Sequence, residues 1–239
     1  RASVSWHRMF ETFFRITSKS EQQTRRMVVN TPAVWLQLGK NTRVGYFTGG
    51  IEYYHDVVNS SGFNVLASGE IVGFNRGEVA DNSTYDLFGV YLQDEIKAGR
   101  FDVTPGIRFT RARVKAINVD PIPGDAVVFD PLRDTFSALT GSLRVVFHAN
   151  ENWNVIAGWG MGFRTPSLDD LTAIKLVMSG SLDLPATNLK PERTHTFDLG
   201  VRSSFAKWEM ALFGFYTSMD DFIRRVPVGD FNGDGKVDF

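Results

Sequence analysis

The segment from Trp153 to Phe163 alternates large apolar side chains with small or polar ones. Its odd-numbered positions are all apolar, and three of its five even-numbered positions are glycine. Because successive side chains of a strand project to opposite faces, this period of two predicts a strand with one broad apolar face. Eleven residues rising ~3.3 Å each cover ~36 Å, and a tilt of ~45° brings this close to the ~25 Å apolar band of an outer-membrane barrel. The segment therefore has the pattern and length of a strand that crosses a membrane.

Similar patterns predict nine long strands along the chain. They cover residues 3–16, 25–38, 43–56, 84–97, 100–115, 134–148, 152–164, 192–204 and 207–225. Segments 101–110 and 195–202 alternate cleanly, whereas 208–217 carries apolar residues at both parities, so its pattern does not orient it. Soluble strands average ~5–6 residues and these are about twice as long, which favours a transmembrane barrel over a soluble β-sandwich or jelly roll.

The connections between these segments alternate between tight turns and long loops. The tight turns are at 39–42, 98–99, 149–151 and 205–206, and the long loops are at 57–83, 116–133 and 165–191. Loop 17–24 is modest, and the residues after Pro227 are expected to form another external loop. Because outer-membrane barrels have short periplasmic turns and longer extracellular loops, the alternation predicts which end of the sheet faces the periplasm.

Composition excludes several classes of protein without naming a ligand. The 239 residues carry 26 Lys and Arg against 27 Asp and Glu, so no charge excess predicts a nucleic-acid partner. No apolar run approaches the ~20 residues of a membrane helix, and the mean hydropathy is -0.15. Cysteine is absent, which excludes disulfides and thiolate chemistry. The chain opens at Arg1 without a signal segment, so we expect it to be a piece of a longer protein.

Aromatic residues fit the girdles that outer-membrane barrels place at the two membrane interfaces. The chain has 20 Phe, 6 Tyr and 5 Trp. Trp35, Trp153 and Trp208 lie near predicted tight turns, where we expect the periplasmic interface.

Charged residues on the strands predict a wet interior. The residues expected to line the lumen or its rim are Arg108, Arg144, Arg202, Asp94, Glu95 and Asp198. Two arginine pairs, Arg25 with Arg26 and Arg111 with Arg113, could attract an anionic iron chelate or a lipopolysaccharide phosphate at the outer rim. Solvated strand ends explain these pairs equally well.

Two regions carry motifs of one family. The first reads Gly-Phe-Arg-Thr-Pro-Ser-Leu-Asp-Asp-Leu at 162–171, Asn-Leu-Lys-Pro-Glu-Arg at 188–193 and Thr-Phe-Asp-Leu-Gly at 196–200. The second, upstream, reads Tyr-Leu-Gln-Asp-Glu at 91–95 and Thr-Pro-Gly-Ile-Arg-Phe at 104–109. Over about 84–225 the chain resembles the barrel of TonB-dependent outer-membrane receptors. It departs from the family at Thr165, where the family has Ala, and at 186–187, where Ala-Thr replaces Asn-Pro.

The resemblance implies an all-β fold in which residues 1–239 form part of an antiparallel transmembrane β-barrel of about 22 strands. In this family an N-terminal plug closes the lumen, and the inner-membrane TonB complex supplies work for import. Neither the plug nor a TonB-contacting segment is recognisable in these residues, so the TonB complex is expected as a partner only through an absent N-terminal region. The other expected partners are lipid and lipopolysaccharide of the Gram-negative outer membrane and a small-molecule nutrient chelate.

The function implied by the resemblance is TonB-dependent uptake of a ferric siderophore or a similar scarce nutrient. Cobalamin, a glycan or another metal complex fits nearly as well, and a passive porin-type channel and a soluble β-sandwich binding domain are the alternatives. Residues 167–187 contain no histidine, which disfavours a haem ligand in that loop. An enzyme is not expected, because the chain lacks a G-x-S-x-G motif and its four histidines are dispersed.

Five residues carry the family pattern: Arg164, Pro166, Leu189, Pro191 and Glu192. The prolines are expected to bring the long loop off one strand and onto the next. A structural role is therefore favoured over ligand contact.

A second motif, at 230–238, has the residue order of a calcium-binding loop. Oxygen side chains stand at positions one, three, five and nine, glycine at six, and a backbone carbonyl is expected at position seven. The predicted ligands are Asp230, Asn232, Asp234, Lys236 through its carbonyl, and Asp238. Position twelve would fall at 241, beyond the printed residues. A polar turn without metal explains the same composition.

Overall fold

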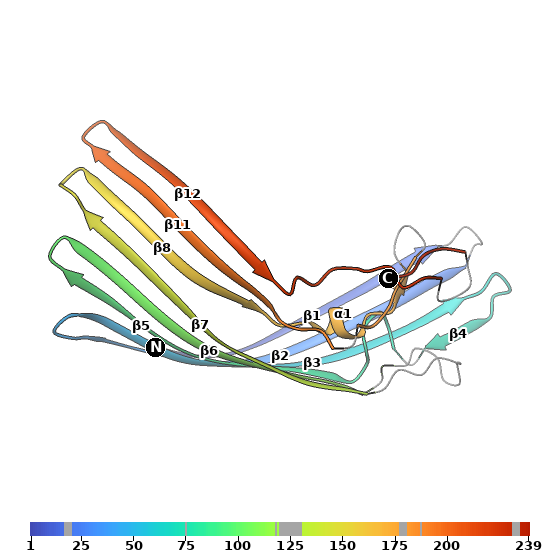
Figure 1. Cartoon of the computed structure of the whole chain (residues 1–239). Helices are drawn as coiled ribbons and strands as arrows, with labels where there is room; N and C mark the ends of the chain where they lie inside the picture. The colour runs from blue at the N-terminus through green and yellow to red at the C-terminus, as the bar shows by residue number, and fades with distance from the viewer. Residues whose placement is uncertain are drawn as a thin grey trace.

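Nine long strands lie side by side in chain order in one antiparallel sheet, and a short tenth strand pairs with the third (Figure 1). The strands are β1 (Ala2–Ile16), β2 (Gln22–Asn41), β3 (Gly45–Val65), β4 (Ile71–Phe74), β5 (Ser83–Ala98), β6 (Phe101–Ala116), β7 (Leu132–His148), β8 (Trp153–Arg164), β11 (Glu192–Phe205) and β12 (Trp208–Asp220). Between β8 and β11 lie α1 (Leu168–Thr172), β9 (Lys175–Leu176) and β10 (Leu182–Asp183).

This computed structural model describes residues 1–16, 21–74, 76–117, 119, 131–176, 181–186, 188–230 and 235–239. Within these ranges, no helix is long and apolar enough to cross a membrane.

All nine predicted strands are present, but two predicted boundaries are wrong. The third strand runs on to Val65, so much of the predicted loop 57–83 is strand. Residues 57–65 continue the same register by pairing with 22–30 of β2, and their sequence lacks the strong alternation that would have marked them as strand. The last strand ends at Asp220 rather than 225, because Asp221 has a φ of 55°, which is outside the strand region.

One face of the sheet collects apolar side chains from all of the long strands. Directly opposed residues of an antiparallel pair project to the same face, so the strand registers define that face. One row of opposed residues reads Leu36, Ile51, Val90, Phe109 and Leu139. A second row reads Leu143, Trp159, Phe197 and Tyr216. We call this the lipid face, because it is continuous and apolar over the whole width of the sheet.

The opposite face is polar or bare. Its rows read Gly50, Tyr91, Arg108 and Thr140 on one side of the sheet, and Arg144, Gly158, Asp198 and Phe215 on the other. The even-numbered glycines of β8 lie here, as the alternation predicts. This is the face that a barrel turns to its lumen, and we call it the luminal face.

The aromatic girdle lies on the lipid face beside the tight turns. Its rings contact one another across strands: Phe205 stacks on Trp208 at 4.3 Å between centroids, and the Trp153 and Phe205 rings meet edge to face at 6.3 Å. The expectation for Trp35 is wrong, because Trp35 is opposed to Glu52 and so projects to the luminal face. The nearby turn indicates where Trp35 lies along the membrane normal, but its odd position in the alternating strand decides which face of the sheet it projects to.

Strand β12 is oriented by its pairing with β11, which the sequence pattern could not do. Met210 and Leu212 share the lipid face with Val201, whereas Phe213 projects to the luminal face. The Phe213 ring lies over Gly200, where an added Cβ would come within 2.2 Å of the ring. Glycine at 200 therefore makes room for a luminal aromatic ring.

The two ends of the sheet differ as the loop lengths predict. Figure 1 shows the tight turns and the N-terminus at one end, and β4, α1 and the C-terminus at the other. At that loop-bearing end, the luminal residues Ala112, Val114 and Ala116 of β6 are 0–2% exposed. Ala80 and Val119 from two loops, together with Leu168 of α1, pack with Ala116.

The buried side chain of Arg76 holds these loops together. It is 1% exposed, and its guanidinium donates hydrogen bonds to the carbonyls of Val119 and Glu78, both at 2.6 Å, and to that of Thr172. Thr172 also accepts a hydrogen bond from Ala80 N through its hydroxyl at 3.1 Å. One arginine therefore joins the segment after β4, the segment after β6 and α1.

Replacing Arg76 is expected to loosen the loops and leave the wall intact. Arg76→Met removes the donors of several buried carbonyls, and each group left unsatisfied costs about 1–3 kcal/mol. Hydrogen exchange of the intact receptor should show faster exchange over 76–82 and 168–173 and unchanged exchange in β6. Arg111→Met, which alters an exposed arginine on the same sheet, is the control. Equal protection in both variants would contradict this role of Arg76.

Candidate functional site

Two cavities lie at the loop-bearing end of the sheet, and both are lined by Lys175 and Asp169. These two side chains form an ion pair, with 2.8 Å between Nζ and Oδ2. Asp169 is placed by the short helix α1, which begins at a capping box: the Ser167 hydroxyl accepts from Asp170 N, and the Asp170 carboxylate accepts from Ser167 N.

The first cavity, of about 260 Å³, lies against the luminal face of β1 to β3. Arg25 is fixed in it by hydrogen bonds to the carbonyls of Thr24 and Phe63, at 2.9 and 3.1 Å, and by the Phe74 ring, whose centroid is 4.5 Å from the guanidinium carbon. Across the cavity, burial raises the pKa of the Glu78 carboxyl above its usual value, and Lys175 acts in the opposite direction. The cavity thus presents cations and a carboxylate to whatever enters it.

The second cavity is larger, about 470 Å³, and lies between α1, the loop before β11 and the C-terminal tail. The tail is fastened to β10, because Phe239 N donates to Leu182 O at 3.0 Å and Leu184 N donates to Phe239 O at 2.7 Å. Arg225 in the lining contacts Asp183 Oδ2 at 2.5 Å. The other oxygen, Asp183 Oδ1, is buried without a hydrogen-bond partner among the described residues.

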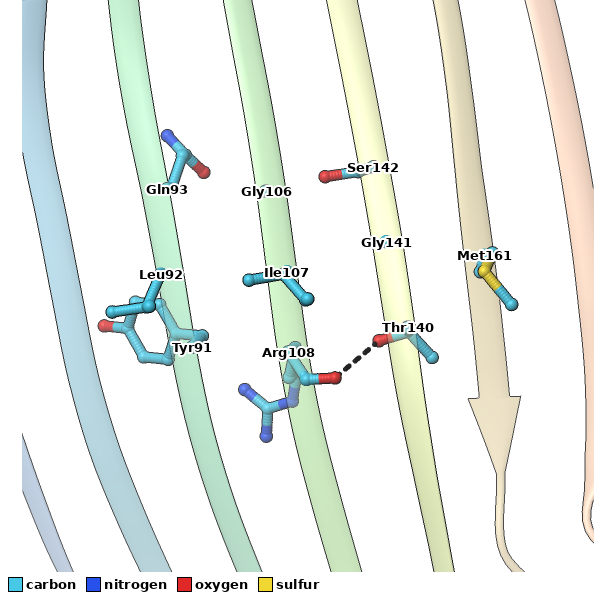
Figure 2. A pocket seen from close by; sticks show the side chains of 10 residues that line it. All are labelled: Tyr91, Leu92, Gln93, Gly106, Ile107, Arg108, Thr140, Gly141, Ser142 and Met161. Carbon is cyan, nitrogen blue, oxygen red and sulfur yellow. Dashed lines mark hydrogen bonds between the residues drawn. The ribbon is translucent and has the colours of Figure 1, made fainter.

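A third hollow, of about 310 Å³, lies in the middle of the wall (Figure 2). The pairing of β7 with β8 stops beside it, at Ser142 and Gly160, so the wall is thin there and the lining comes from both faces. Ile107 belongs to the lipid face and Arg108 to the luminal face. Because this hollow is a thin part of the wall, we place the candidate site at the two cavities of the loop-bearing end instead.

The family-motif residues meet at the same end. Arg164, the last residue of β8, contacts Asp170 Oδ2 at 2.7 Å and Glu192 Oε2 at 3.3 Å. Glu192 is 8% exposed, and its other oxygen accepts a hydrogen bond from Ile223 N at 2.9 Å. Pro166 is fully buried. Leu189 lines the larger cavity, and Pro191 leads directly into β11.

The residues of the proposed calcium loop are only partly described. Asn232 and Asp234 lie outside the described residues. Asp230 Oδ2 accepts a hydrogen bond from Gly235 N at 2.9 Å, and the buried Asp238 accepts one from Leu182 N at 2.7 Å. Within the described ranges, no group of three or more His, Asp or Glu side chains is arranged to hold a metal ion.

The strand registers show which of the charged residues predicted to line the lumen project to the luminal face. Arg108, Arg144, Arg202, Glu95 and Asp198 project to the luminal face. Arg108 forms an ion pair there with Glu52 of β3.

Two adjacent pairs of charged residues divide between the faces. Asp94 was expected beside Glu95 but projects to the opposite face, because neighbouring residues of a strand alternate. The same rule separates Arg25, on the luminal face, from Arg26, on the lipid face.

Sequence reasoning missed Arg76, Glu78, Lys175 and Arg225. Arg76, Glu78 and Lys175 stand in predicted long loops and Arg225 stands at the end of the last predicted strand, and no periodicity at these places marks a side chain that turns inward. The sequence separation between Arg76 and Thr172, 96 residues, shows why no local pattern could have identified this contact.

Arg164 is expected to stabilise the connection between β8 and β11. Arg164→Gln leaves the buried Glu192 without its cation, so local opening should become easier by about 1–3 kcal/mol. Hydrogen exchange at 168–173 and at Ile223 measures this effect. Arg193→Gln is the matched control, because Arg193 is exposed on the other face of β11. The same protection in both variants would rule out the bridging role.

Three solved structures with a similar fold are considerably longer than this chain. A structure described as the copper transporter OprC has a TM-score of 0.75 at 16% identity, with 92% of this chain and 35% of that chain covered. The ferric yersiniabactin uptake receptor FyuA from Yersinia pestis has a TM-score of 0.66 at 15% identity, covering 92% and 33%. The hemophore receptor HasR of Serratia marcescens, in complex with its hemophore HasA and heme, has a TM-score of 0.65 at 13% identity, covering 92% and 40%. The chain thus spans about a third to two fifths of these proteins.

A family model described as "TonB dependent receptor-like, beta-barrel" matches residues 3–237, nearly the whole chain. The match agrees with the open antiparallel sheet, its lipid face and its luminal face. The chain therefore belongs to the TonB-dependent receptor family of the Gram-negative outer membrane, and it forms part of the β-barrel.

Proposed function

We propose that this chain is part of the wall and mouth of a receptor that imports a ferric siderophore or a comparable metal chelate. The observation that carries the proposal is the pair of cavities at the loop-bearing end. They are lined by Arg25, Lys175, Arg224 and Arg225 among mixed acidic groups, and such donors suit an anionic or oxygen-rich chelate. The similar structures include a copper transporter, a hemophore receptor with heme and a ferric yersiniabactin uptake receptor, so metal-containing cargo is a reasonable expectation for this chain.

Import further requires a plug and the TonB complex. In the whole receptor, the N-terminal region would form the plug and contact the TonB complex. A luminal aromatic residue supports the plug over an open porin-type channel. Phe215 projects to the luminal face of β12. An apolar ring of this size is costly in a water-filled pore, whereas a folded domain in the lumen would cover it. The role proposed for the chain is transport and recognition, without catalysis, and its outer partners are outer-membrane lipid and lipopolysaccharide.

Charge reversal in the larger cavity tests the ligand class. Arg224→Glu is expected to lower the affinity for an anionic ferric chelate by about tenfold or more, because one attraction becomes a repulsion. Arg224→Lys should retain most of it, and Lys207→Glu in the β11–β12 turn is the control. Chelate binding to the whole purified receptor and iron uptake by iron-starved cells are the measurements.

Two results would contradict the import proposal in different ways. An unchanged affinity in Arg224→Glu would favour an uncharged cargo such as a glycan. Uptake that persists in cells without the TonB complex would favour a passive channel.

We also propose that residues 230–238 bind calcium and stiffen an external loop. The order of oxygen side chains and the hydrogen bond between Asp230 and Gly235 support this proposal. Calorimetric titration of the whole receptor should give binding with a Kd of about 10⁻⁴–10⁻³ M, as in extracellular calcium modules, and Asp230→Asn should weaken it. No heat at millimolar calcium would remove the proposal.

A further inference from the structure

A ladder of cations follows β6 on the lipid face, immediately beyond the apolar residues. Arg111, Arg113 and Lys115 occupy alternate positions and are exposed. Arg133 of β7, also exposed, lies directly opposite Lys115. Because alternate residues of a strand are about 7 Å apart, the four cations form a patch that is two strands wide. We call it the cation ladder.

The cation ladder lies at the level of a lipid headgroup. Below it on the same face of β6, the side chains at alternate positions from Phe101 to Phe109 are all apolar, and none is charged. These nine residues cover about 30 Å along the strand, which the tilt of a barrel strand reduces to roughly the 25 Å apolar band. The tight turn lies at the other end of β6, so the ladder marks the outer leaflet.

Three of the four cations in the ladder have no carboxylate partner among the described residues, and the fourth, Arg113, faces Asp86. Like charges directly opposite one another destabilise a pair of strands, yet Lys115 and Arg133 are opposed. Among the residues that the structure describes, no ion pair involves either of them or Arg111.

The carboxylate nearest to the ladder is already engaged. Asp86 is opposed to Arg113, but its Oδ1 accepts a hydrogen bond from Tyr53 at 2.5 Å and lies 2.7 Å from His55 Nδ1. A hollow of about 320 Å³ lies beside it, lined by Tyr53, Asp86, Phe88, Arg111 and Arg113. The patch therefore combines an excess of cations with room for an anionic group.

We propose that the cation ladder binds the phosphate groups of lipopolysaccharide in the outer leaflet. The ladder projects away from the lumen, so it cannot hold a chelate on its way through the barrel. A ligand that fits it carries phosphates beside acyl chains, and the exposed Phe109 and Leu139 directly below offer apolar contact to those chains. Arginine suits this task because its planar fork pairs with two phosphate oxygens. The inference refines the lipopolysaccharide contact of the proposed function and requires only the outer-membrane location.

Removing pairs of these cations tests the site. In the whole receptor purified in detergent, the double variants Arg111→Gln with Arg113→Gln and Lys115→Gln with Arg133→Gln should each bind diphosphorylated lipid A roughly 10- to 30-fold more weakly. Lys40→Gln with Arg43→Gln, which removes two cations beside a tight turn, is the matched control and should bind like the parent. Arg111→Lys with Arg113→Lys keeps the charge and guards against a folding defect in the glutamine variant.

Competing ligands identify the source of the phosphate. Inorganic phosphate at millimolar concentration should not displace lipid A, and dephosphorylated lipid A should bind as weakly to the parent as the intact lipid does to the variants. The inference is overturned if the ladder variants bind like the parent, if the control loses as much affinity, or if free phosphate displaces the lipid. Iron uptake is measured in the parent strain as well, and a parent receptor that binds lipid A but takes up no ferric chelate would count against the transport proposal alone.

Discussion

The structure depends on one constraint: a strand in a membrane must satisfy its backbone groups through its neighbours while its two faces meet different surroundings. Unpaired amide and carbonyl groups are costly in hydrocarbon, so each interior strand has a hydrogen-bonded neighbour on both sides, although β7 and β8 pair with each other only over 142–148 and 154–160. A register shift of one residue would turn every apolar side chain to the wet face. The registers of the nine long strands avoid this, and they keep Leu36, Ile51, Val90 and Phe109 in one row. The lipid face and the luminal face are thus consequences of the same pairing.

Beyond the apolar band this constraint is released, and the chain uses different interactions. The loops are held over the luminal face by two arginines with separate partners. Arg76 gathers backbone carbonyls from segments far apart in sequence, and Arg164 joins α1 to the start of β11 through two carboxylates. A guanidinium serves both tasks because its donors point in several fixed directions. The two cavities lie between the segments that these arginines hold, so their shape depends on contacts outside their own lining.

Charge is distributed according to what each face meets. Luminal charges such as Arg108 and Glu52 pair with each other, which keeps the inner wall hydrated at little net charge. On the lipid face, charge is sparse among the apolar residues, with Arg8 and Asp94 as exceptions, and beyond the apolar residues of β6 it is positive. The difference is physically reasonable because the lumen provides water, whereas the rim of the outer leaflet provides anionic headgroups.

The sequence by itself determined the strands, their order of tight and long connections, and the family. These features follow from period-two alternation and short motifs, which are local properties of the chain. The orientation of 208–217, the luminal position of Trp35 and the separation of Asp94 from Glu95 needed the strand registers, because a face is fixed by the partner strand as much as by the residue. The contacts at the loop-bearing end could not be predicted at all. Arg76, Lys175 and Arg225 act through contacts between loop segments, and only the folded sheet decides the positions of these segments.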